Sequence, residues 1–190
     1  MSDRSLLGAG DLPDEVIHRL AADQLGYPLD DTRLVGIEVD VVDYPLETLT
    51  TAGRWWVSVA LTTPCGSRSV RFFVKGVQSF ARSPMFAMIP EPVRAMAEAS
   101  VPWDTEPLVY ASDLAGCLPD GLTMPCAVDV RFLDEGSAVI WLPEVDAVES
   151  AWPVDSFAAA ARLLGRLSAS ARVRPFAALG EKYGRRGARL

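Results

Sequence analysis

Three strand-like stretches in the first half of the chain set most of what it can fold into. Residues 35–42, 54–62 and 69–77 are rich in β-branched and aromatic side chains. The segment Pro64-Cys65-Gly66-Ser67 is a tight connection between the second and third stretches. Consecutive strands with short links predict an antiparallel meander.

A helix is predicted ahead of this meander, over residues 11–25. Asp11 can cap its amino end, and Gly26 supplies a stop. His18, the only histidine of the chain, lies inside this helix without a neighbouring catalytic partner. We therefore expect His18 to have a surface or packing role.

Further helices and two more strands follow the meander. In chain order, the predicted elements are a helix at 93–99, a helix from Asp104 or Thr105 to Gly116, strands at 125–133 and 138–142 joined by Asp134-Glu135-Gly136, and a long helix after Trp152-Pro153. This order predicts an α+β fold with a five-stranded antiparallel sheet and packed helices.

The long helix is expected to begin with a cap at Asp155 or Ser156 and to gather its apolar side chains on one face. Those side chains belong to Phe157, Ala160, Ala161, Leu164, Leu167 and Ala171. The segment after Arg172 is rich in arginine and small residues, which predicts a poorly ordered, solvated tail.

Composition excludes several classes of function. A net charge of -7 argues against a general binder of nucleic acid or anionic membranes, which the mean field would repel. The three cysteines, Cys65, Cys117 and Cys126, form no CxxC pair, so we expect neither a metal site nor a disulfide framework. No signal peptide is recognised, and no apolar run approaches the roughly 20 residues that span a bilayer. A reduced, cytoplasmic setting is predicted.

Lys75 is the residue with the clearest functional implication. It closes the apolar stretch Val70-Arg71-Phe72-Phe73-Val74-Lys75-Gly76-Val77. A cation at the end of such a strand suits a site that holds an anion, either a phosphate or a carboxylate. The plainer alternative is a side chain that reaches solvent along its aliphatic stem.

Several stretches carry a resemblance to a known family. They are Phe72-Phe73-Val74-Lys75, Glu106-Pro107-Leu108-Val109-Tyr110, Leu118-Pro119-Asp120-Gly121-Leu122 and Ile140-Trp141-Leu142-Pro143-Glu144-Val145. Over about residues 35–171, the chain resembles the amino-terminal lobe of the aminoglycoside phosphotransferase family, which has a protein-kinase-like fold, and is closest to its actinobacterial members. The resemblance divides the chain into a helical segment 1–33, a kinase-like lobe 34–147, a helix after the hinge 148–172 and the arginine-rich tail 173–190.

The resemblance implies a site for ATP or GTP with Mg²⁺. Lys75 would contact the nucleotide phosphates, and Glu106 would pair with Lys75 and hold its ammonium in place. Glu91 and Glu98 are rivals for the role of partner. An acidic residue such as Glu106 is also favoured in a first helical turn for its effect on the helix dipole alone.

Two further segments would complete this nucleotide site. In the loop from residue 44 to residue 53, backbone amides and the hydroxyls of Thr48, Thr50 and Thr51 could approach phosphate, although an ordinary polar hairpin loop is the alternative. Main-chain groups of Glu144 and Val145 would meet adenine. Pro143 stands where related WLED-like stretches have glutamate, and proline donates no hydrogen bond.

The catalytic parts of such a kinase are not found in the sequence. No histidine follows His18, so the HxDxxxxN-like loop is missing, as is a later aspartate to hold magnesium. We therefore predict a lobe without catalytic residues of its own. A noncatalytic interaction module is the alternative, pairing through its inter-lobe face with a second copy or with a separate larger lobe. An unrelated α+β binding protein is the third possibility.

Overall fold

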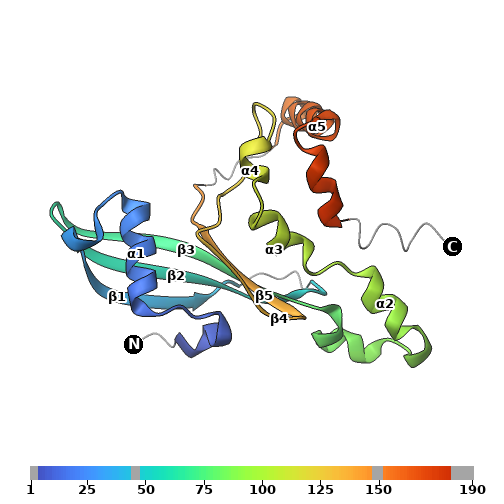
Figure 1. The fold of residues 1–190 in the computed structure, drawn as a ribbon, viewed down its shortest axis with the longest axis horizontal. Coiled ribbons are helices and arrows are strands. Elements are labelled where there is room, and N and C mark those ends of the chain that lie inside the picture. The colour runs from blue at the N-terminus through green and yellow to red at the C-terminus, as the bar shows by residue number, and fades with distance from the viewer. Residues whose placement is uncertain (1–3, 44–47, 147–151, 181–190) are drawn as a thin grey trace.

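The computed structural model describes residues 4–43, 48–146 and 152–180 and shows an α+β fold built on one open, antiparallel sheet (Figure 1). The five strands have the order β1-β2-β3-β5-β4. They are β1 (Arg33–Val41), β2 (Thr51–Thr63), β3 (Gly66–Gln78), β4 (Asp129–Asp134) and β5 (Ser137–Pro143). The predicted α+β class with a five-stranded antiparallel sheet is confirmed.

Helices lie on both sides of this sheet. They are α1 (Asp14–Leu25), α2 (Arg94–Ser100), α3 (Thr105–Tyr110), α4 (Leu114–Cys117) and α5 (Val154–Ala169), with short 3-10 segments that include η1 (Arg4–Gly10) and η6 (Arg174–Gly180). In Figure 1, α1 covers the long strands, while α2 to α5 gather beyond β4 and β5. None of the helices among the described residues is long and apolar enough to cross a membrane.

The predicted meander is present as β1, β2 and β3. Pro64 and Cys65 form the turn between β2 and β3, and Gly66 takes the positive φ of 97° that follows it. The chain then leaves the sheet for its helical segments and returns as β4 on the far edge. Strand β5 turns back to lie between β3 and β4, so it pairs with both.

The main core lies between α1 and one face of the sheet. Val57 of β2, Phe72 of β3 and Trp141 of β5 are fully buried there, and Ile17 and Ala21 of α1 join the same cluster. Successive side chains of a strand point to opposite faces. Since Val74 belongs to this core, the next residue, Lys75, points to the face away from α1.

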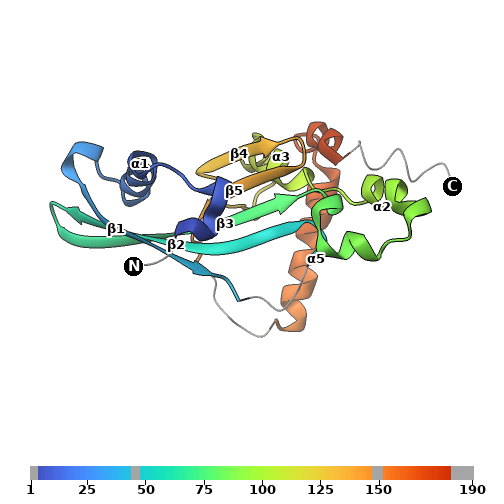
Figure 2. The same cartoon turned by 90° about the horizontal axis from the view of Figure 1, so that it is seen from below.

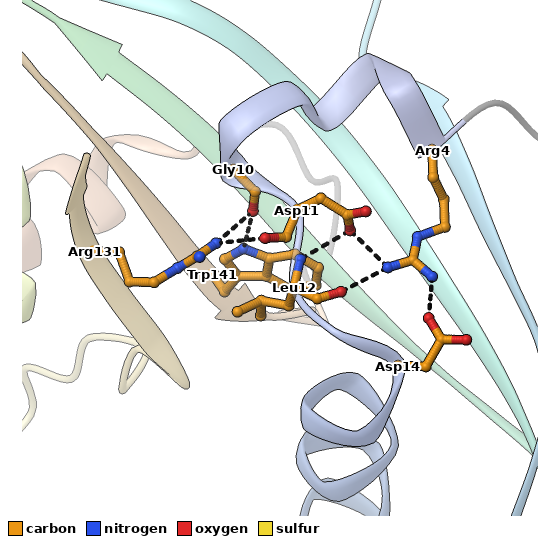
Figure 3. Close-up of polar contacts among 7 residues, drawn as sticks. All are labelled: Arg4, Gly10, Asp11, Leu12, Asp14, Arg131 and Trp141. Carbon is orange, nitrogen blue, oxygen red and sulfur yellow. Dashed lines mark hydrogen bonds and ion pairs between the residues drawn. The ribbon is translucent and has the colours of Figure 1, made fainter. Parts of the chain in front are cut away.

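The segment ahead of α1 is held against the sheet by polar contacts (Figure 3). The carbonyl oxygen of Gly10 accepts hydrogen bonds from Arg131 Nη2 at 2.7 Å and Trp141 Nε1 at 3.2 Å. The guanidinium of Arg4 binds Asp11 at 2.8 Å and also pairs with Asp14. These contacts tie η1 to β4 and β5 across more than a hundred residues of sequence.

The structure corrects the predicted start of the first helix. Helix α1 begins at Asp14 after Pro13, which makes no side-chain cap. Asp11 lies outside the helix, where its carboxylate accepts from Arg4 and from the backbone amide of Leu12. The predicted stop is confirmed, because Gly26 is the left-handed C-cap with φ 73°.

The helix predicted from residue 104 to Gly116 is broken into α3 and α4. Ser112 lies in the break, where its hydroxyl donates to the carbonyl of Val109 and accepts from the amide of Leu114. Such local bonds compete with those of a continuous helix. The strand predicted from residue 125 is also shorter, since β4 begins at Asp129.

Helix α5 departs from prediction at its cap and on its apolar face. It begins after Pro153, so neither Asp155 nor Ser156 is its cap. Phe157 and Leu164 are 60% and 59% exposed, and no residue of the helix is buried. The apolar face exists in the sequence, but most of it is left uncovered by the described part of the chain.

The tail prediction is wrong for its first part. Val173, Phe176 and Leu179 recur every three residues and are half-buried in and around η6, which packs against α3. A spacing of three residues matches the period of a 3-10 helix, so this pattern predicts that the three side chains lie on one side of it. Arg172 also donates to the carbonyl of Gly116. Residues 181–190 lie outside the described part of the chain.

Candidate functional site

The structure brings Lys75 and Glu106 together. Lys75 Nζ lies 2.6 Å from Glu106 Oε2, and the two side chains are 21% and 37% exposed. The contact between Lys75 and Glu106 expected from the sequence is therefore present. Strand β3 continues to Gln78, so Lys75 lies inside the strand rather than at its end.

Helix α3 positions Glu106 over the sheet. Glu106 stands in the first turn of α3, which contacts β4 and β5 and has Pro107 buried. Ile140 of β5 is the register partner of Lys75 and is fully buried. Glu106 therefore approaches Lys75 from the face of the sheet opposite α1.

Neither Glu91 nor Glu98 pairs with Lys75 in the described part of the chain. Glu98 of α2 accepts a hydrogen bond from the hydroxyl of Ser79 at 3.0 Å. Glu91 begins a short 3-10 segment, and its side chain is exposed. Spacing along the chain alone could not separate these three acids, because the break between α2 and α3 decides which of them faces the sheet.

A second cation lies beside Lys75. Arg54 of β2 is its direct register partner on the other side from Ile140. Like charges directly opposite one another in a sheet are unfavourable. Arg54 and Lys75 therefore place two positive charges side by side, and Glu106 balances that of Lys75.

Aromatic side chains continue the same face of the sheet. Phe73 lies two residues before Lys75, and its register partner Trp56 meets it edge to face with ring centroids 5.3 Å apart. The guanidinium of Arg71 lies 4.3 Å from the centroid of the Trp56 ring. An aromatic surface next to a cation can take a ligand that has both a flat ring and an anionic group.

The two predicted hinge residues are placed differently from one another. Glu144 forms an ion pair with Arg71, and its backbone amide donates to the carbonyl of Arg71 at 3.0 Å. This amide is therefore already bound. Val145 follows with its side chain 58% exposed, which leaves it accessible at the end of the sheet.

The predicted loop threonines bond to one another and to the end of β3. The hydroxyl of Thr48 donates to that of Thr51, and the carbonyl of Thr50 accepts from the amide of Gln78 at 2.8 Å. Thr48 and Thr51 line a pocket of about 410 Å³, which Arg54 also lines and Lys75 does not. The first residues of the proposed phosphate loop, 44–47, lie outside the described residues.

A second pocket was not anticipated from the sequence. It has a volume of about 480 Å³ and lies where β3 runs beyond the end of β5. Its polar lining comes from Gln24, Ser58, Ser69, Arg71, Glu144 and Asp146. Arg71 lines this pocket and also contacts the ring of Trp56. The only feature of the sequence that indicates the pocket is the alternation of polar and apolar residues along β3.

Tyr110, four residues after Glu106, has a shifted pKa. Burial raises the pKa of Tyr110, and the negative charge of Glu106 one turn earlier raises it further. His18 takes no part in the site, because its Nε2 lies 2.7 Å from the hydroxyl of Thr32, whose own hydrogen goes to the carbonyl of Leu29. This contact ties α1 to the turn that follows it. Across the three described ranges, no cluster of three His, Cys, Asp or Glu could hold a metal ion.

Comparisons of the chain with protein-family models, with curated proteins and with solved structures found no match. The resemblance to the aminoglycoside phosphotransferase family thus rests on the sequence stretches quoted above.

Proposed function

We propose that this chain is a nucleotide-binding lobe of the kind found in small-molecule phosphotransferases, with ATP or GTP as ligand. The observation that carries the proposal is the ion pair between Lys75 and Glu106, 2.6 Å apart on the face of the sheet opposite α1. Kinase-like lobes use a strand lysine held by a helix glutamate to bind nucleotide phosphates. Transfer of the phosphoryl group is not part of the proposal.

The ion pair between Lys75 and Glu106 contributes little to folding stability. A partly exposed ion pair contributes about 1 kcal/mol or less to stability. Holding a long lysine side chain in one place costs conformational entropy of similar size. The pair therefore adds little to folding and holds an ammonium group beside an aromatic surface, where a ligand could use it.

The geometry also indicates how a nucleotide would be held. Glu106 occupies one of the three donors of the Lys75 ammonium, which leaves the others for phosphate oxygens. Trp56 and Phe73, two residues along the sheet, offer apolar and aromatic surface to a base or sugar. Arg54 adds positive charge opposite Lys75.

The test is the thermal stability of the full chain with increasing magnesium nucleotide. A ligand that binds only the folded state stabilises it by about 2.7 kcal/mol at one hundred times its dissociation constant. We expect this rise for the wild type, and its loss in Lys75→Met.

Arg68→Met is the matched control, since Arg68 lies on the same strand with an exposed side chain that, among the described residues, bonds only to the neighbouring carbonyl of Ser67. This variant should keep the full response. A wild type that is not stabilised at millimolar nucleotide, or a Lys75→Met variant that responds equally, would overturn the proposal.

A second candidate function is that of an interaction module. The observation that favours it is the exposure of large apolar side chains on and next to α5, where Trp152, Val154, Phe157 and Leu164 are 58%, 83%, 60% and 59% exposed. Such a group of exposed apolar residues is typical of a surface that meets another protein.

A further inference from the structure

Helix α3, which carries Glu106, has little stability of its own. It spans only six residues, and its N-cap Asp104 makes no side-chain capping bond to it. Isolated helices shorter than about 12 residues are marginal in water, so a helix this short is held in place by packing against other elements. The position of the Glu106 carboxylate therefore depends on what α3 contacts.

Two parts of the chain, besides the neighbouring helix α4, pack against α3. The first is the sheet, since α3 contacts β4 and β5 and Glu106 pairs with Lys75 of β3. The second is η6, the red segment after α5, which lies beside α3 in both Figure 1 and Figure 2. The helix that supplies Glu106 is thus in contact with the last described segment of the chain.

Three apolar side chains give η6 a packing surface. Val173, Phe176 and Leu179 recur every three residues, which places them on one side of a 3-10 helix, and each is half-buried. Among the described residues, α3 is the main packing partner of η6. We therefore attribute the partial burial of these side chains to α3. Phe176 has the largest of the three side chains and contributes most of this surface.

Few other contacts hold this end of the chain. No residue of α5 is buried. Arg172 donates to the carbonyl of Gly116, and Leu163 lies 3.1 Å from where a Cβ on Gly121 would be. Segments with few buried apolar contacts open locally at a small cost in free energy. We therefore expect η6 to exchange between a docked and a released state.

We propose that η6 is a positioning element for the Lys75 site. When η6 is docked, its apolar side holds α3 in place and keeps Glu106 beside Lys75. When η6 is released, α3 loosens and the ammonium loses its partner. The role of η6 rests on the proposed function, because it concerns the control of the same site. Since coupling between two sites is reciprocal, a nucleotide that prefers the paired Lys75 also favours docked η6.

The experiment observes Lys75 directly and without nucleotide. The chain has two lysines, Lys75 and Lys182. NMR of the full chain with 13C-labelled lysine therefore gives two ε-methylene signals, and Lys182→Arg assigns them. Glu106→Gln marks the signal of Lys75 without its charged partner. We expect Phe176→Ala to move the Lys75 signal from its wild-type position towards that of Glu106→Gln, because a rapidly exchanging signal averages the docked and released populations.

Matched variants separate positioning from a general loss of structure. Phe157→Ala removes the same side chain from the amino-terminal half of α5, which extends below the other elements in Figure 2. Phe157 is 60% exposed, and its loss should leave the Lys75 signal in place. Phe176→Leu keeps apolar bulk against α3 and should restore the wild-type signal. Leu179→Ala is a smaller change on the same side of η6 and should move the signal in the same direction as Phe176→Ala.

Nucleotide binding tests the coupling between η6 and the site. Phe176→Ala should bind magnesium ATP about fivefold more weakly than the wild type or Phe157→Ala, which is the lower end of the usual coupling between two sites. If the wild type binds no nucleotide, the proposed function fails, while the NMR comparison still decides the role of η6.

Two kinds of result would overturn the proposal. An unchanged Lys75 signal in both Phe176→Ala and Leu179→Ala, or an equal change in Phe157→Ala, would show that η6 does not position Glu106. A changed signal with unchanged nucleotide affinity would show that the docking of η6 is not coupled to the ligand of the site.

Discussion

Gly10 lies where an added methyl group would collide with β5. A Cβ at this position would be 2.9 Å from Val139 Cγ2 and 3.3 Å from its Cγ1. Val139 is 4% exposed, and a β-branched side chain has little rotamer freedom, so it cannot turn aside. The carbonyl of Gly10 is also held by Arg131 and Trp141, so a shift of the backbone would stretch both hydrogen bonds.

We therefore expect Gly10→Ala to lower the free energy of unfolding by about 1–3 kcal/mol, the usual cost of overpacking a core. Val139→Ala removes the two methyl groups concerned and should cost about 2 kcal/mol by itself. The double variant should cost less than the sum by about 1–2 kcal/mol, since the added methyl fills space that the lost ones leave. Urea unfolding of all four proteins gives this coupling energy.

Gly36→Ala is the matched control, because nothing lies within 4 Å of a Cβ at that position on β1. It should leave the free energy of unfolding within about 0.5 kcal/mol of the wild type. Costs of Gly10→Ala and Val139→Ala that add within about 0.5 kcal/mol would refute the close contact between η1 and β5.

Two further expectations concern titrating groups. A hydrogen bond from Arg82, with further backbone and hydroxyl donors, lowers the pKa of Asp134 from its usual 3.8 to about 2. The ionised Asp134 should therefore stabilise the fold fully above pH 3.8, and this stabilisation should be lost as the pH falls towards 2. Asp134→Asn should make the unfolding free energy less dependent on pH in this range. The same pH dependence in Asp134→Asn and the wild type would contradict the contact between Arg82 and Asp134. Glu106→Gln should lower the pKa of Tyr110 but leave it above 10.0, because the effect of burial remains. Ultraviolet titration measures this pKa, and Tyr110→Phe assigns the signal. An unchanged pKa in Glu106→Gln would show that Glu106 does not lie beside Tyr110.

Local patterns were enough to predict the sheet. Alternating β-branched and aromatic residues with short turns specify a meander, and all three of its strands were found in place. Helix ends were predicted less well. Asp11 and Asp155 are good capping residues by type, but Asp11 pairs with Arg4, and α5 starts two residues too early for Asp155 to cap it.

The polar contacts that join distant segments could not be predicted from sequence patterns. Arg131 and Gly10 are separated by 121 residues, and no spacing rule connects them. The stack of Arg71 on Trp56 likewise depends on the register of β2 and β3. By contrast, the pairing of Lys75 with Glu106 was anticipated because the family resemblance supplied the long-range contact.

Equilibrium binding of nucleotide tests the central claim most directly. Isothermal titration of the full chain with magnesium ATP or GTP should show saturable binding of one nucleotide per chain. Lys75→Met should weaken it by about tenfold or more, since a charged hydrogen bond to phosphate is worth about 1.5–3 kcal/mol. Absence of saturable heat at millimolar nucleotide, or equal affinity in Lys75→Met and wild type, would contradict a phosphate-binding role for Lys75.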